Sequence, residues 1–133
     1  MTLTESLFSY LKTDTNVASM ITDGSVFHIY PLRLPEGFVN NAHAGSAISY
    51  TEINHQHPYP LLKKSTFQLN VFGDTFDNAT KLCEYVYQCL DDKANLNLGT
   101  SFPVAYVKVE GRQSFFDEAS KLWYYALDIS IKY

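Results

Sequence analysis

Histidine is the residue type of this chain that could most readily bind a metal. His55 and His57 lie two positions apart, and His28 and His43 precede them. A metal site usually needs three or four converging ligands, and no cysteine or carboxylate stands at ligand spacing from the pair. We interpret His28 as a strand residue with a satisfied ring nitrogen, and His55 and His57 as solvated loop residues. The sequence therefore predicts no metal site.

The two cysteines are expected to be reduced thiols. Cys83 and Cys89 are six residues apart on a predicted helix, a rise of about 9 Å. A disulfide needs Cα atoms within about 7 Å, so an intact helix keeps the two thiols unlinked. The nearby basic residues are Lys81 and Lys93, with no histidine, so a nucleophilic thiolate is unsupported. We expect Cys83 in the core.

Paired carboxylates could act as a general acid and a general base, and the chain has two such pairs. Asp91-Asp92 ends the predicted helix, and Asp117-Glu118 lies in a predicted connection. Catalysis requires two carboxylates in contrasting environments within a cleft, whereas charges at such positions are ordinarily solvated. GxSxG, HExxH and phosphate-loop patterns are also absent. We expect no catalytic residue, no cofactor and no enzymatic activity.

Length and composition describe an ordinary soluble protein. The 133 residues suit a single domain spanning 1–133, and no apolar run of about 18 residues predicts a membrane span. The N-terminus lacks the basic region and cleavage site of a signal peptide, which indicates intracellular synthesis. The net charge of -4, with one adjacent basic pair at Lys63-Lys64, argues against specific nucleic-acid binding.

The aromatic content is unusual, because ten Tyr, nine Phe and one Trp make up 15% of the chain. Tyrosine is favoured at protein interfaces, where it offers a large area with a polar tip. Two interpretations stay open. The rings could fill a Tyr-rich core and sheet, or they could serve self-association or the binding of a large partner.

Residues 63–92 form one readable unit of strand, turn and helix. In the strand, Phe67, Leu69 and Val71 alternate with polar residues. In the helix, apolar residues recur at steps of three and four, after an N-cap at Asp74 or Thr75. This stripe consists of Phe76, Ala79, Cys83, Val86 and Leu90.

The remaining chain supplies further helices and strands. A capping box predicts a first helix from Thr2, and Asp14 or Thr15 restarts a short helical turn. Strands are predicted at 25–31, 46–53, 102–111 and 121–133, with connections at 32–45, 54–62 and 112–120. In the last strand, one predicted face carries Trp123, Tyr125, Leu127, Ile129, Ile131 and Tyr133.

The predicted fold class is α+β. We expect a single domain with a mostly antiparallel sheet of about five strands and two main helices packed on one face, in the order α-β-β-β-α-β-β. The 54–62 loop and the non-core face of the last strands suit assembly better than catalysis, unless a loop or second layer covers that face. The candidate interaction residues are His55, Gln56, His57, Tyr59, Lys63, Lys64, Tyr106 and Tyr124.

The layout of the whole chain resembles the tail-completion family (tail-terminator, or tail-to-head joining) of long-tailed bacteriophages and their prophages. The resemblance rests on DGSVFHIYP, SAISYTEI, the polar loop with prolines, FQLNVFGDTFDNATKLCEYVYQCLDD and WYYALDISIKY. It implies a structural virion protein of the tail or neck, assembled in the bacterial host cytoplasm. The family's function implies a ring, commonly a hexamer, at the head-proximal end of the tail tube, which terminates tail polymerisation and mediates head-tail joining.

The partners implied by the resemblance are other copies of the chain, the tail-tube protein and the head connector or stopper protein, with no catalytic site and no membrane. A ring repeats one heterologous interface, so each subunit needs two different complementary surfaces. The alternative is a small α+β ligand-binding or enzymatic domain, with a pocket formed by the 32–45 and 54–62 loops around the histidines.

Overall fold

The structure, a computed structural model, describes residues 3–23, 26–31, 46–59, 62–91, 106–118 and 121–133. A five-stranded sheet forms its base. The strand order is β3-β4-β5-β7-β6. The strands are β3 (Ile29–Pro31), β4 (Ala47–Tyr59), β5 (Leu62–Gly73), β7 (Leu122–Lys132) and β6 (Tyr106–Asp117). Neighbouring strands are antiparallel except β3 and β4, which are parallel. Two short strands, β1 (Thr22–Asp23) and β2 (Val26–Phe27), pair separately.

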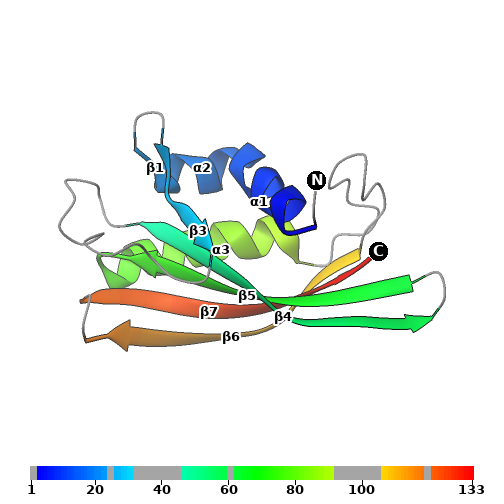
Figure 1. The fold of residues 1–133 in the computed structure, drawn as a ribbon. Helices are drawn as coiled ribbons and strands as arrows, with labels where there is room; N and C mark the ends of the chain where they lie inside the picture. Colours follow the sequence, from blue (N-terminus) through cyan, green and yellow to red (C-terminus); the bar gives the residue numbers. More distant parts are fainter. Residues whose placement is uncertain (1–2, 24–25, 32–45, 60–61, 92–105, 119–120) are drawn as a thin grey trace.

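The helices of the described chain, α1 (Leu3–Thr13), α2 (Thr15–Ile21) and α3 (Phe76–Leu90), lie on one side of this sheet (Figure 1). Of the two candidates predicted for each cap, Asp14 caps α2 and Thr75 caps α3, whereas Thr2 lies outside the described residues. The Asp14 side chain accepts a hydrogen bond from the Val17 N–H, and that of Thr75 accepts one from the Asn78 N–H. None of the described helices is long and apolar enough to cross a membrane.

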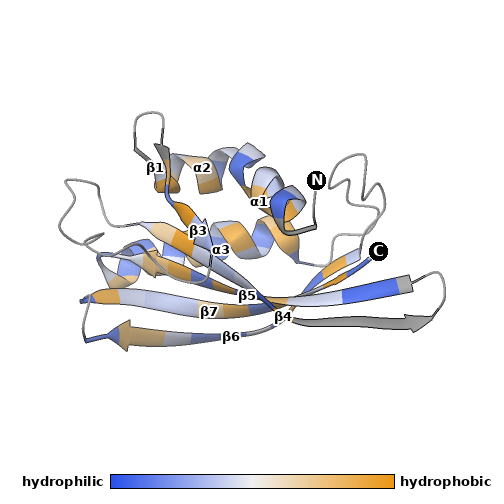
Figure 2. Ribbon diagram, in the orientation of Figure 1, coloured by the Kyte–Doolittle hydropathy of each residue, from blue (hydrophilic) through white to orange (hydrophobic). Residues whose placement is uncertain are grey.

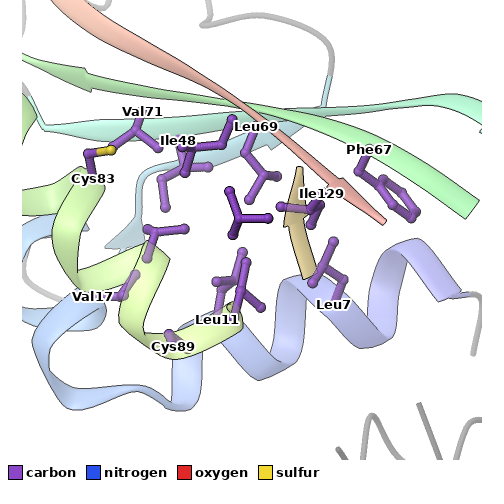
Figure 3. Close-up of a cluster of buried hydrophobic side chains, with 14 of the residues drawn as sticks. Leu7, Leu11, Val17, Ile48, Phe67, Leu69, Val71, Cys83, Cys89 and Ile129 are labelled. Carbon is purple, nitrogen blue, oxygen red and sulfur yellow. The ribbon is translucent and has the colours of Figure 1, made fainter. Parts of the chain in front are cut away.

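The main core lies between the helices and the sheet (Figures 2 and 3). Phe67, Leu69 and Val71 of β5 are fully buried there, as the alternation in the sequence predicts. The α3 stripe is also confirmed from Ala79 onward, whereas Phe76 at its start is 48% exposed. Both cysteines are free thiols in buried positions. The α+β fold class and the mostly antiparallel sheet are therefore as expected.

The predicted loop at 54–62 is wrong, because residues 54–59 continue β4. Pro58 and Pro60 suggested that no strand runs through this segment, since proline has no N–H to donate to a neighbouring strand. Pro58 sits where the register shifts between Gln56 and Tyr59. One side of β4 pairs with β5, and the other side pairs with β3 only at Ile48–Tyr50. Residues 54–59 therefore form an edge among the described strands. An edge or bulge tolerates a proline.

The predicted connection at 112–120 is also wrong, because β6 runs to Asp117. After Val109 the strand shifts register at Gly111, and its side chains become exposed on both faces up to Phe116. A strand without a buried face shows no apolar alternation, so the pattern that identified the other strands is missing. The predicted strand at 25–31 is divided at His28 into β2 and β3.

Candidate functional site: an aromatic rim and a lysine end

Four large aromatic side chains are exposed at the end of the sheet where β6 ends and β7 begins. We call this group, Phe76, Phe115, Phe116 and Trp123, the aromatic rim; its members are 36–48% exposed. Phe116 and Trp123 are paired across the two strands, and their ring centroids lie 4.7 Å apart. Phe76, at the start of α3, meets Trp123 edge-on at 5.3 Å. These three rings therefore form one contiguous cluster.

The rim extends to both faces of the sheet, because successive residues of a strand point to opposite sides. Phe115 lies opposite Tyr124 in the register, and their rings stack at 5.2 Å. Tyr124 in turn contacts the buried Phe72 ring at 5.2 Å. A small second cluster thus exists on the face away from α3, and it also contains Ala47, Leu122 and Tyr30.

Exposed aromatic groups of this size usually mark a contact site, since leaving such rings in water forgoes the free energy of burying them. Phe115 and Phe116 fall in a predicted connection, so the sequence did not identify them as part of a surface. Trp123 was expected on the same face as Tyr125 and Leu127, and on that side its ring meets Phe76 of α3 while remaining 36% exposed. The adjacent pair Phe115-Phe116 was the available signal. Aromatic residues favour strands, and two in succession must point to both faces.

The structure divides the candidate interaction residues between the two ends of the sheet. Gln56, Lys64 and Tyr106 lie in one cross-strand row that also includes Lys132. Tyr124 lies eight residues along β7 from that row, roughly 27 Å away at 3.4 Å per residue. Tyr106 and Tyr124 are both half-buried, and they belong to separate surfaces.

The remaining candidates lie near the first row. Along β4, His55 pairs with Ser65 and Tyr59 pairs with Leu62, while His57 falls within the register shift. The Lys63 N–H donates to the Tyr133 carbonyl at 2.8 Å, and the Tyr133 N–H donates to the Lys63 carbonyl at 2.9 Å. These contacts fix the backbone at the start of β5.

Four lysines gather at this second end, which we call the lysine end: Lys63, Lys64, Lys108 and Lys132. Lys64 is half-buried and the other three are exposed. Within the described chain, none of the four makes an ion pair. Among the described residues, the lysine end therefore carries more positive than negative charge, with Glu110 as the carboxylate near Lys108.

A shallow groove of about 460 Å³ lies between α3 and β6. It is lined by Glu84, Tyr87, Val109, Glu110, Gly111 and Arg112. Arg112 Nη1 lies 2.6 Å from Glu84 Oε1, and this contact raises the pKa of the guanidinium. Burial raises the pKa of the neighbouring Cys83 thiol. The Ser130 hydroxyl donates a hydrogen bond to Glu110 Oε1 at 2.9 Å, so each charged side chain of the groove has a partner. Because the Cys83 thiol also stays protonated, the groove offers no poised nucleophile or base.

His28 is the histidine whose side chain the structure describes. His28 is buried, and its Nδ1 lies 2.5 Å from the Tyr30 hydroxyl, which agrees with a satisfied ring nitrogen. Among the residues that the structure describes, no three His, Cys, Asp or Glu side chains gather as metal ligands. In the alternative interpretation, the 32–45 and 54–62 loops form a pocket around the histidines. Residues 54–59 belong to strand β4 instead, and both His43 and the whole 32–45 connection lie outside the described residues.

Comparisons with known proteins concern the fold. The sequence matches no family model and, at a significant level, no curated protein. The structure is similar to a chain in a solved structure described as the virion of a native gene transfer agent (GTA) particle, with a TM-score of 0.68 and 16% sequence identity. The match covers 98% of this chain and 92% of that chain, so the two share one fold over nearly their whole lengths.

Proposed function

We propose that residues 1–133 form a single tail-completion-like domain, a structural subunit of a phage-like virion. It acts by assembly rather than by turnover. Copies form a ring at the head-proximal end of the tail tube, where the ring terminates tail polymerisation and mediates joining to the head. The observation that carries this proposal is the fold shared over 98% of the chain with a virion component.

The distribution of surface groups supports an assembling subunit. A ring repeats a heterologous interface, which requires two different surfaces on each copy. The aromatic rim and the lysine end are such surfaces, and they differ in chemistry. The rim combines exposed rings with nearby carboxylates, whereas the lysine end carries four cations.

The partners proposed for the ring are the tail-tube protein on one side and the head connector on the other. The net charge of -4 suits a ring through which DNA passes, because tight binding of phosphates would slow transit. Assembly would occur in the bacterial cytoplasm, and the mature location is the tail or neck of the virion.

Light scattering and negative-stain microscopy of the purified chain, alone and mixed with purified tail tubes, test this proposal. We expect closed rings, or caps at one end of each tube, and tubes that no longer elongate. A chain that stays monomeric in isolation and also fails to cap tubes would refute the proposal. Rings in isolation without capping would support oligomerisation but reject the terminator role.

A further inference from the structure

We propose that the lysine end of one copy binds the aromatic rim of the next, so that copies join head to tail along the strand direction. The inference rests on the proposed function, because it identifies the interface from which that ring would be built. Its occupant is a second copy of this chain.

Position is the first argument, because the two surfaces lie at opposite ends of the same strands. Within β5, Lys63 is the second residue of the strand, and Gly73 ends it opposite Trp123. Ten residues at about 3.4 Å each separate these ends by roughly 34 Å. Figure 1 shows the β4–β5 end and the β6–β7 end on opposite sides of the molecule. One copy can therefore engage two neighbours at once.

Charge is the second argument, because the two ends carry opposite sign. The carboxylates beside the aromatic rim are Asp74, Asp77, Asp117 and Glu118. Two lysines partly offset them in the described chain: Lys81 pairs with Asp77 at 3.1 Å, and Lys121 pairs with Glu118 at 3.6 Å. Four acids against two bases leave this end negative, whereas the lysine end is positive. The hydrophilic start of β5 is blue in Figure 2.

Ring chemistry is the third argument. An ammonium group is attracted to the face of an aromatic ring, and most strongly to tryptophan. The chain already makes this contact internally, since Lys12 Nζ lies 4.1 Å from the centroid of the Phe8 ring. A lysine of the neighbouring copy could meet Trp123 or Phe116 in the same way while its charge faces the carboxylates.

A symmetric contact between two aromatic rims is the rival arrangement. It would bury the same rings, but it would also bring the carboxylates of both copies together. Like charges across an interface repel each other and suppress that pairing. An isologous contact would also close as a dimer, whereas the head-to-tail contact leaves a free end for ring growth.

Two charge-reversal variants, K63E/K64E/K132E and D74K/E118K, test the interface by sedimentation velocity. The first leaves three glutamates against Lys108 at the lysine end, and the second leaves four lysines against Asp77 and Asp117 at the rim end. Each variant alone has like-charged ends, so we expect its association to weaken about tenfold. In a 1:1 mixture, each variant offers the other an end of opposite sign, so assembly should return with the two variants alternating. The control is D128K, which reverses an exposed charge in the middle of the sheet and should assemble like the wild type.

Each outcome separates the two proposals. Recovery in the mixture would support the inference and also show that both variants are folded, which circular dichroism would check independently. If the wild type forms rings and both variants do so equally well, the inference fails while the proposed function stands. No recovery in the mixture, or stronger association of D74K/E118K alone, would also overturn it. A wild type that remains monomeric even on tail tubes would reject both proposals.

Discussion

Arg112 Nη1 lies 2.6 Å from Glu84 Oε1, so a single ion pair ties the edge strand β6 to the outer side of α3. The guanidinium carbon also lies 5.7 Å from the centroid of the Tyr87 ring and 5.8 Å from that of Tyr125. Arg112 follows the register shift at Gly111, where the burial of β6 by the helices ends. This residue therefore anchors the part of β6 that leads to the aromatic rim.

We expect Arg112→Ala to lower the free energy of unfolding by about 1–2 kcal/mol. Both side chains of the ion pair are 43% exposed, so solvent limits the pair to about 0.2–1 kcal/mol, and the two ring contacts add a similar amount. Urea unfolding would measure the change, and a cycle with Glu84→Ala would isolate the pair. The control is Lys81→Ala, whose more exposed pair with Asp77 should contribute almost nothing. A cycle without coupling would contradict the anchoring role.

Gly73 is required at the end of β5, because α3 begins against it. A Cβ at this position would lie 2.3 Å from the Ala79 backbone nitrogen and 2.9 Å from its Cα. Backbone atoms of a packed helix cannot move away cheaply, so we expect Gly73→Ala to destabilise the fold by about 1–3 kcal/mol. Chemical denaturation would measure this.

Gly111→Ala is the matched control for that substitution. A Cβ at Gly111 would meet nothing within 4 Å, so the change should be neutral, or stabilising by about 0.4–1 kcal/mol because the unfolded chain loses freedom. Equal effects of the two substitutions would show that contact with α3 does not determine the requirement for glycine.

The Tyr10 hydroxyl links α1 to the end of α3 by donating a hydrogen bond to the Cys89 carbonyl at 3.0 Å. Burial, followed by contacts with Cys89, raises the pKa of this phenol from 10.0 to about 12. Because the folded pKa is raised, the stabilisation is complete below pH 10 and is lost as the pH rises toward 12. We expect the free energy of unfolding to fall with pH over that window.

Tyr10→Phe should make this fall less steep, because it removes the titrating group. At neutral pH the same variant should lose about 1 kcal/mol, the typical net contribution of one hydrogen bond. Urea unfolding at pH 8, 10 and 11.5 would measure both effects. An unchanged slope above pH 10 would show that other tyrosines account for the dependence.

The elements with one buried face could be predicted from the sequence. Phe67, Leu69 and Val71 alternate because α3 covers one side of β5, and that periodicity identified both the strand and its buried face. The sequence narrowed each cap to two neighbouring residues, Asp14 or Thr15 and Asp74 or Thr75, because a capping side chain acts locally on the next turn. For β5, the alternation in the sequence agrees with the burial in the folded chain; for the caps, the hydrogen bond is local to the helix end.

The aromatic rim could not be predicted by the same reasoning. Phe115 and Phe116 belong to a strand segment exposed on both faces, which has no periodicity. The spacing of Phe76 in α3 and of Trp123 in β7 continues the pattern of buried residues in those elements. Both residues nevertheless lie beyond the point where the helices and the sheet cover each other. Only the paired strands and the start of α3 bring these distant residues together.

Trp123 offers a direct test of burial at the rim, because it is the only tryptophan of the chain and is 36% exposed. We expect its fluorescence to shift to shorter wavelength, and its quenching by acrylamide to fall, as the chain assembles. Phe116→Ser removes the ring that lies against it and should weaken assembly about tenfold, as truncation of a central aromatic contact does. Ile53→Ser is the control, since Ile53 is 54% exposed on β4, outside the aromatic rim. If both substitutions weaken assembly equally, general surface hydrophobicity drives association. If assembly leaves the Trp123 spectrum unchanged, the rim stays in water and the contact lies elsewhere.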